Sequence, residues 1–193
     1  MRLKISLSLL LLLSVAVLYG QDSRPVRPAK NKGTKPAIDW KEKLYYGGNV
    51  GFQMSNYGGY LDLSPNIGYK INNYVSGGVQ FIYTNMWTRY GNLTYKYTFY
   101  GAGVFARVKT FDWLFLQAEY DLLDVPDNFS IVSRKRTLAD VPLAGLGLRN
   151  QLGDNASYYL LFLYEFAPTP NSPYTYGPFA SPLVYRVGFN INF

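Results

Sequence analysis

The stretch LVYRVGFNINF, at residues 183–193, alternates between two kinds of residue along its whole length. Every second position is apolar: Leu183, Tyr185, Val187, Phe189, Ile191 and Phe193. The positions between them are mostly small or polar, and they hold Val184, Arg186, Gly188, Asn190 and Asn192. Because successive side chains of a β-strand point to opposite sides, this period of two predicts a strand with one apolar and one polar face.

The same period continues back to Leu44 and predicts seven further strands. It is clear near residue 50 and at 61–71, 75–88 and 114–122, and weaker at 94–109, 137–151 and 156–166. We expect short turns at 55–59, 72–73, 110–112 and 153–155, and longer connections at 89–93, 124–136 and 167–180. This arrangement is typical of a barrel with turns at one end and loops at the other. The sequence therefore predicts an all-β fold, an eight-stranded antiparallel up-and-down transmembrane β-barrel over residues 44–193.

A soluble, lipocalin-type barrel is the alternative for the same strand pattern. Its outer face would be heavily charged, since soluble surfaces carry about 25–35% charged residues. Here the polar faces are mostly small and uncharged, and the opposite faces are aliphatic and aromatic. Tyrosines and tryptophans gather near the expected strand ends, where a bilayer interface would lie: Tyr45, Tyr46, Trp87, Tyr90, Tyr95 and Trp113. The pattern favours the transmembrane barrel.

Residues 1–20 have the layout of a secretory signal peptide. Arg2 and Lys4 precede an apolar stretch from Leu7 to Leu18, and Gly20 is the small residue expected before a cleavage site. A single anchoring helix is the alternative, but it would need about 20 apolar residues. Residues 21–43 carry seven basic groups, three acidic groups and three prolines, so we expect a disordered, basic periplasmic tail.

The composition excludes several kinds of activity. The net charge of +7 belongs mainly to the first 43 residues, because residues 44–193 carry ten basic and nine acidic groups, and no nucleic-acid partner is expected. The chain has no cysteine and no histidine, which removes the usual general base and the commonest metal ligand. We predict no catalytic residue, no metal and no cofactor.

Eight strands enclose a space that side chains can fill. The inward face is expected to be mostly Gly, Ser, Asn and Gln, with four acidic and four basic residues: Asp62, Glu119, Asp121, Glu165, Lys70, Arg107, Arg149 and Arg186. Unpaired charge in a dry interior is costly, so these eight residues are predicted to form one paired network in the lumen.

Residues 44–193, about three quarters of the chain, resemble the small OmpA/OmpX-like outer-membrane barrels and, more closely, the short barrels of Bacteroidota. The resemblance rests on YYGGNVG at 45–51, QAEY at 117–120 and YRVGFN at 185–190. It implies a barrel in the cell outer membrane and little about activity. The terminal apolar residues, Tyr185, Val187, Phe189, Ile191 and Phe193, resemble the signal that the bacterial barrel-assembly machinery reads.

Two connections are candidates for contacts outside the barrel wall. Arg134, Lys135 and Arg136 end the loop at 124–136 and would suit the phosphates of lipopolysaccharide, with a solvated loop as the alternative. The last loop, 167–180, has four prolines and two tyrosines and is expected to cap the barrel or to contact a partner.

Two classes of function remain open from the sequence. The first is a non-enzymatic barrel with a structural or interaction role, such as an accessory subunit of a larger outer-membrane complex. The alternative is a lipid-directed enzyme or a narrow conduit. The expected partners are outer-membrane lipid and lipopolysaccharide, the assembly machinery during biogenesis, and a protein in the outer membrane or periplasm.

Overall fold

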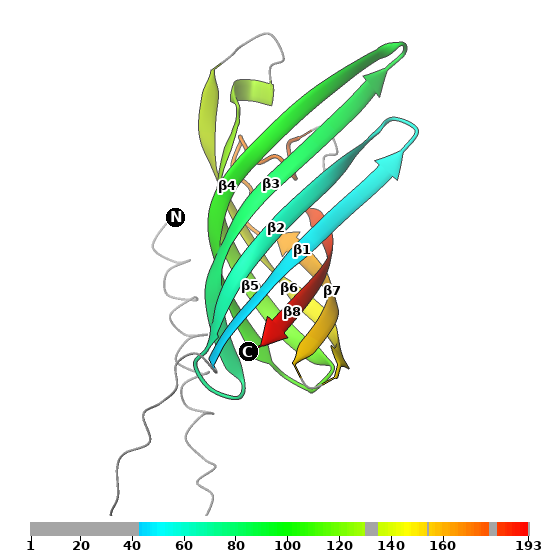
Figure 1. The fold of residues 1–193 in the computed structure, drawn as a ribbon. Helices are drawn as coiled ribbons and strands as arrows, with labels where there is room; N and C mark the ends of the chain where they lie inside the picture. The colour runs from blue at the N-terminus through cyan, green and yellow to red at the C-terminus, as the bar shows by residue number, and fades with distance from the viewer. Residues whose placement is uncertain (1–42, 130–134, 154, 178–180, 193) are drawn as a thin grey trace, which may run out of the picture. The chain divides into compact units, whose positions relative to one another are not determined.

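Eight antiparallel strands form a closed barrel in the computed structural model, which describes residues 43–129, 135–153, 155–177 and 181–192 (Figure 1). The strands are β1 (Leu44–Ser55), β2 (Gly58–Lys70), β3 (Val75–Tyr90), β4 (Leu93–Lys109), β5 (Leu114–Pro126), β6 (Arg136–Leu152), β7 (Ala156–Glu165) and β8 (Leu183–Asn192). Each strand pairs with its neighbours in sequence, and β8 closes the barrel on β1. The all-β, eight-stranded up-and-down architecture predicted from the sequence is confirmed.

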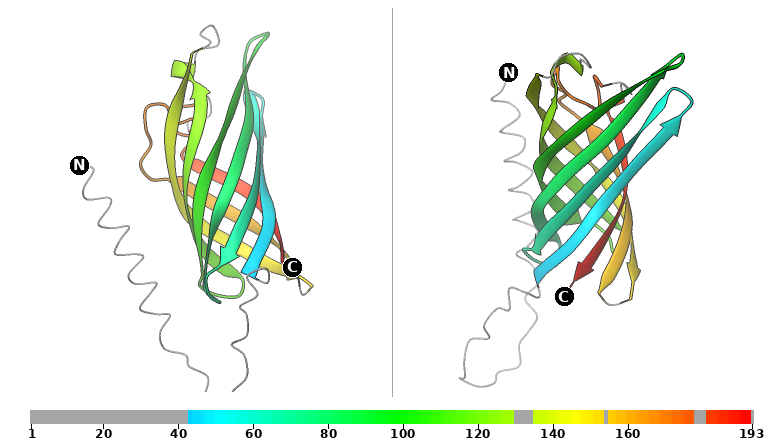
Figure 2. Two further views of the ribbon diagram at one scale, coloured as in Figure 1. Left: turned by 60° about the vertical axis from the view of Figure 1, so that its left-hand side comes forward. Right: turned by 45° about the horizontal axis from the view of Figure 1, so that its top comes forward.

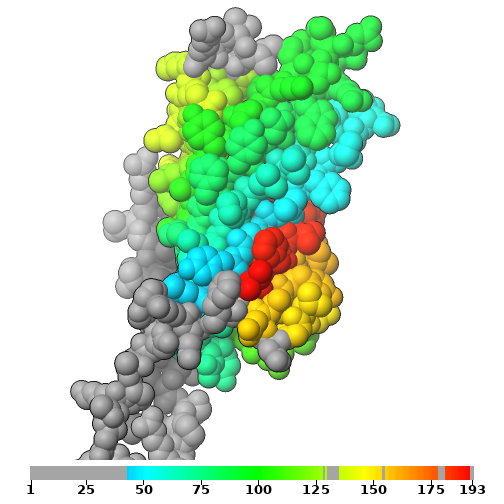
Figure 3. All heavy atoms as spheres, in the orientation of Figure 1, coloured from blue at the N-terminus to red at the C-terminus, as the bar shows by residue number. Residues whose placement is uncertain are grey.

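The closing seam between β1 and β8 runs in register from Val50↔Val187 to Tyr45↔Asn192. In the two views of Figure 2 the strands are tilted and wind around a common axis. On the face drawn in Figure 3, the side chains of β8 lie directly between those of β1 and β7, without an opening in the wall. Over these residues neither terminal strand is a free edge, so an aggregation-prone edge is removed there.

The two ends of the barrel differ in their connections. We call the end with residues 71–74, 110–113 and 153–155 the turn end, and the opposite end the loop end. Residues 127–135 and 166–182 are the long connections of the loop end, and the first begins with a short 3-10 helix at Asp127–Phe129. Within the described ranges, no helix is long and apolar enough to cross a membrane.

One connection is shorter than predicted. Residues 89–93 were expected to form a longer connection, but β3 and β4 pair as far as Tyr90↔Leu93, which leaves a turn of two residues. Gly91 has a φ of 58°, a left-handed conformation that glycine adopts without steric cost and that suits a two-residue hairpin. In Figure 1 the tip of the β3–β4 hairpin lies above the tip of the β1–β2 hairpin at the loop end.

The outward positions of the strands form an apolar surface. On β2, for example, Leu61, Leu63 and Ile67 are exposed, whereas the alternate residues Asp62 and Ser64 are fully buried. β8 exposes Leu183, Tyr185, Val187, Phe189 and Ile191 in the same way. The period of two therefore predicted correctly which face of each strand points outward. The charged outward residues of the described strands all lie toward the loop end: Arg89, Lys96, Asp124, Arg136 and Asp140.

The interior is more apolar than predicted. Instead of a mainly small and polar inner face, the buried side chains include a cluster of large aliphatic and aromatic residues from β3 to β8: Ile82, Met86, Phe99, Leu123, Val125, Val141, Leu143, Leu161, Leu163 and Val184. Several of these residues stand next to apolar outward residues, as in YLLFLY at 159–164. An apolar interior makes both faces of such a strand apolar, so the alternation that reveals the inner face disappears from the sequence.

In the half of the barrel near the turn end, inward aromatic rings lie over glycines on the neighbouring strand. The pairs, each directly opposite in register, are Tyr45 with Gly68, Phe115 with Gly147 and Tyr159 with Gly188. A Cβ atom at any of these glycines would fall on the ring. Glycine is therefore the residue that leaves room for a large ring inside a narrow barrel.

Candidate functional site

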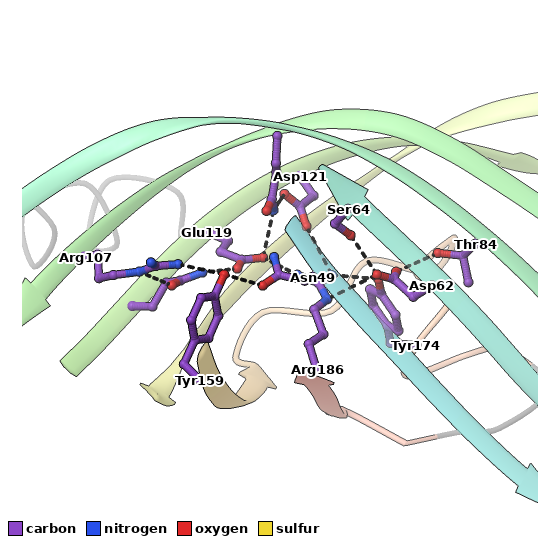
Figure 4. Close-up of polar contacts among 12 residues, drawn as sticks. Asn49, Asp62, Ser64, Thr84, Arg107, Glu119, Asp121, Tyr159, Tyr174 and Arg186 are labelled. Carbon is purple, nitrogen blue, oxygen red and sulfur yellow. Dashed lines mark hydrogen bonds and ion pairs between the residues drawn. The ribbon is translucent and has the colours of Figure 1, made fainter. Parts of the chain in front are cut away.

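Arg186, on β8, is almost completely buried in the middle of the barrel and faces three carboxylates (Figure 4). Its Nη1 donates to Glu119 Oε2 at 2.8 Å, and its Nε lies 3.5 Å from Asp62 Oδ1. Its Nη2 lies 4.0 Å from Asp121 Oδ2 and donates to the hydroxyl oxygen of Tyr174 at 3.2 Å. One guanidinium thus links β8 to β2, to β5 and to the last loop.

Hydroxyl groups satisfy Asp62, which has no exposed surface. Ser64 Oγ donates to Asp62 Oδ1 at 2.7 Å, and Thr84 Oγ1 donates to Asp62 Oδ2 at 2.8 Å. Ser64 lies two residues along β2 on the same face, and Thr84 lies directly opposite on β3. The alternation of each strand and the register between them therefore place both donors at this carboxylate.

Two buried glutamines donate to the other two carboxylates. Gln80 Nε2 donates to Glu119 Oε2 and to Asp121 Oδ1, both at 2.9 Å. Gln117 Nε2 donates to Glu119 Oε1 from two residues away on β5. We call Asp62, Glu119, Asp121 and Arg186 the central charge cluster. Its formal charge is −2, from three carboxylates and one guanidinium, and neutral donors stabilise the excess negative charge.

The last loop folds into the loop end of the barrel. Glu165, at the end of β7, accepts hydrogen bonds from Ser172 Oγ at 2.7 Å and from Thr175 Oγ1 at 2.6 Å. Tyr174, 6% exposed, packs in the apolar cluster and meets Arg186 below it. Of the two roles expected for this loop, the structure confirms that it caps the barrel.

Arg107, on β4, is enclosed by rings instead of carboxylates. Its guanidinium carbon lies 5.3, 4.6 and 4.7 Å from the ring centroids of Phe105, Phe115 and Tyr159. Its Nε donates to Gln117 Oε1 at 2.7 Å, and its Nη2 donates to the Tyr159 hydroxyl at 3.4 Å. A cation over a ring face is stabilised by about 0.5–2 kcal/mol, which offsets part of the cost of burying this charge.

A cavity of about 730 Å³ opens at the turn end, and basic residues predominate among its charged lining residues. We call its five basic side chains, Lys43, Lys70, Arg107, Lys109 and Arg149, the basic cup. The acidic side chain in the lining is Asp112, whose Oδ1 lies 2.6 Å from Lys109 Nζ. Hydrogen bonding to this ammonium lowers the pKa of the exposed Asp112 carboxyl, so it stays ionised. The lining therefore has a formal charge of +4, five basic groups less one acidic group.

The single paired network predicted for eight lumen residues is wrong in its connections. Asp62, Glu119, Asp121 and Arg186 do meet in the central charge cluster. Glu165 instead accepts from hydroxyl groups, and Lys70, Arg107 and Arg149 line the basic cup, where none of these three forms an ion pair with a described carboxylate. The reason is height along the barrel axis: these cations lie near the turn end, whereas the carboxylates lie in the middle or toward the loop end.

Sequence reasoning missed the neutral members of the site. Gln80 and Gln117 each bridge two charged residues, and nothing in the alternation distinguishes them from other inward side chains. Tyr159 and Tyr174 each hydrogen-bond to one buried arginine. It also missed Lys109 and Lys43 in the basic cup. Lys109 follows Arg107 by two residues on β4, a spacing that places both on the same face and that could have revealed it.

The other two predicted sites are only partly described. In the proposed lipopolysaccharide contact, Arg136 Nε lies 2.8 Å from Asp124 Oδ2, and Lys135 Nζ lies 3.5 Å from Asp127 Oδ2. Arg134 lies outside the described residues, as does Phe193 of the predicted assembly signal. Tyr185, Val187, Phe189 and Ile191 of that signal form an outward, apolar row on β8.

Comparisons with known proteins do not assign the chain to a family. A scan of the sequence against family models finds no match, and a search of curated proteins finds no significant match. In the described part of the chain, no group of three or more Asp, Glu, His or Cys residues is arranged to hold a metal ion. The class is thus defined by the fold and its interior: a small closed β-barrel with an apolar outer wall, a buried charge cluster and a cation-lined cavity at the turn end.

Proposed function

We propose that this chain is an exported protein of the cell outer membrane, a small barrel of the OmpA/OmpX-like kind with a structural or interaction role. One observation carries the proposal: the barrel is apolar on its outside and filled on its inside. Lipid-facing positions of transmembrane barrels are apolar, because the hydrocarbon region offers no water to polar side chains. Away from the strand ends, the exposed positions hold mostly Leu, Val, Ile, Phe and Tyr, which fit that environment.

The filled interior favours a structural or interaction role over a conduit. The central charge cluster, the apolar cluster above it and the inserted Tyr174 occupy the lumen between the basic cup and the loop end. In this proposal the turn end faces the periplasm, as short turns do in outer-membrane barrels. The proposal includes a role as an accessory subunit of a larger outer-membrane complex. Co-purification in mild detergent is the direct way to find such a partner.

Contact with lipopolysaccharide at the loop end is a weaker part of the proposal. Lys135 and Arg136 would face the anionic headgroups there, and arginine forks suit phosphate. Both side chains already face carboxylates, Asp127 and Asp124, so the charge that they offer to lipid is reduced. The contact is therefore expected to contribute little to the affinity for lipid.

The proposal predicts outer-membrane fractionation and heat-modifiable migration. On a sucrose gradient the protein should band with the outer membrane, and unboiled samples should migrate differently from boiled samples on SDS gels. A closed barrel keeps every strand hydrogen-bonded on both sides, so SDS does not open it without heat. Recovery in the soluble periplasm would contradict the location. Stable ion conductance in planar bilayers would contradict the filled interior and favour a conduit.

The outward row on β8 predicts a defect in assembly when the chain end is changed. Replacing Phe193 by Asp should lower the amount of protein in the outer membrane several-fold, while barrels that do form should keep normal resistance to SDS. The comparison variant is Tyr46→Ser, which removes an exposed aromatic residue from the neighbouring strand β1. Membrane levels and heat-modifiability are measured for both variants. Normal levels of the Phe193 variant would remove the assembly-signal interpretation.

A further inference from the structure

We infer that the basic cup is a binding site for a phosphate-bearing anion. Its five cations converge on one cavity from β2, β4, β6 and the residue before β1. Repulsion among like charges this close opposes folding, and the lining itself offers only Asp112 as compensation. A bound polyanion would remove that repulsion.

Arg107 gives the cavity a fixed cationic floor. It is 8% exposed, and three aromatic rings and two neutral acceptors hold its guanidinium in place. With the Asn190 amide oriented to suit its neighbours, Asn190 Oδ1 accepts from Arg107 Nη1 at 3.0 Å. Such a side chain loses little conformational entropy on binding a ligand, because it is already ordered.

Ser157 lies in the lining of the same cavity. It is 3% exposed, and its hydroxyl has no hydrogen-bond partner in the described structure. A buried hydroxyl without a partner costs about 1–3 kcal/mol. Because this oxygen has almost no accessible surface, a ligand oxygen would accept its hydrogen bond only after a small shift of the neighbouring side chains.

Charge and size together define the class of ligand. A formal charge of +4 exceeds what a single carboxylate would balance, and guanidinium and ammonium groups are the usual protein partners of phosphate. A volume of about 730 Å³ is larger than bare phosphate needs and lies within the usual range for small organic ligands, about 300–1,000 Å³. The ligand is thus a phosphorylated small molecule or a phospholipid headgroup.

Titration of the purified chain in maltoside micelles with inorganic pyrophosphate tests the site. Calorimetry should show saturable binding, and Lys70→Gln and Arg149→Gln should each weaken it about ten-fold or more, because each removes a charged hydrogen-bond donor. Both residues are half-buried at the cavity wall, so the barrel should survive their replacement. The matched control is Lys96→Gln, which removes an exposed cation far from the cup near the tip of β4. Heat-modifiable migration checks that each variant is folded.

Three results would overturn the inference: no saturable binding, equal weakening by Lys96→Gln, or equal affinity for citrate, which would make the site a general anion site. The source of the phosphate is decided by adding short-chain phosphatidylglycerol to the same micelles. Displacement of pyrophosphate would support a lipid headgroup as the ligand, and retention would support a soluble phosphorylated molecule.

Discussion

Replacing Arg186 by methionine is expected to lower the free energy of unfolding by about 3–5 kcal/mol, as is usual when one partner of a buried ion pair is removed. The variant leaves three carboxylates, Asp62, Glu119 and Asp121, in the barrel without their cation. It also removes the donor to Tyr174 and so loosens the last loop. Urea unfolding in detergent micelles measures the loss of stability. If the variant does not fold, it should migrate at the same position on SDS gels with and without boiling.

Two further variants separate charge from packing at Arg186. Combining Arg186→Met with Asp62→Asn, Glu119→Gln and Asp121→Asn should recover most of the loss, since replacing a whole buried ionic group by neutral residues is often close to neutral. Lys135→Met, which removes a largely exposed ion pair with Asp127, should cost no more than about 1 kcal/mol. Wild-type stability of the single Arg186 variant would show that the central charge cluster does not hold the barrel together.

A methyl group at Gly188 is expected to destabilise the barrel by about 1–3 kcal/mol, the usual cost of overpacking an interior. The new Cβ would fall on the ring of Tyr159, directly opposite on β7, and about 2.5 Å from Asn49 Oδ1. The ring has no free space to enter, because its hydroxyl donates to Asn49 Oδ1 at 2.6 Å and its face covers Arg107. Urea unfolding of Gly188→Ala measures the cost.

An outward glycine supplies the control for Gly188→Ala. A Cβ at Gly48, on β1, would meet its nearest atom, the Cα of Pro65, at the ordinary contact distance of 3.5 Å. Gly48→Ala should therefore stabilise the barrel by about 0.5–1 kcal/mol, because alanine restricts the unfolded chain. Equal effects of the two substitutions would contradict the close packing of Tyr159 over Gly188.

The strand pattern predicted the fold, and it predicted which side chains point inward, because both depend only on the alternation along each strand. Asp62, Glu119 and Arg186 come from three segments far apart in the sequence, yet alternation alone assigns all three to the lumen. A closed barrel turns every correctly assigned polar face toward the same narrow space. For these residues, alternation along the strand was sufficient.

The sequence did not predict the position of each inward side chain along the barrel axis. Arg107 and Arg149 were assigned to the lumen correctly, but their pairing with carboxylates failed because it depends on how far each strand is staggered against the next. The stagger is set by hydrogen-bond register around the whole barrel, and no single strand carries it. Interior positions such as Ile82 and Leu161 were missed for another reason, since an apolar residue between apolar neighbours leaves no alternation to detect.

The separation of charge along the axis makes the barrel an electrostatic double barrier. The cup at the turn end has a formal charge of +4, and the central charge cluster beyond it is net negative. Low-dielectric walls focus such potentials along the axis. A small cation that arrives from the turn end is repelled at the entrance, whereas an anion is drawn in and then stopped by the carboxylates. In the proposed membrane setting, this arrangement would oppose the leakage of ions of either sign when the packing of the lumen briefly loosens.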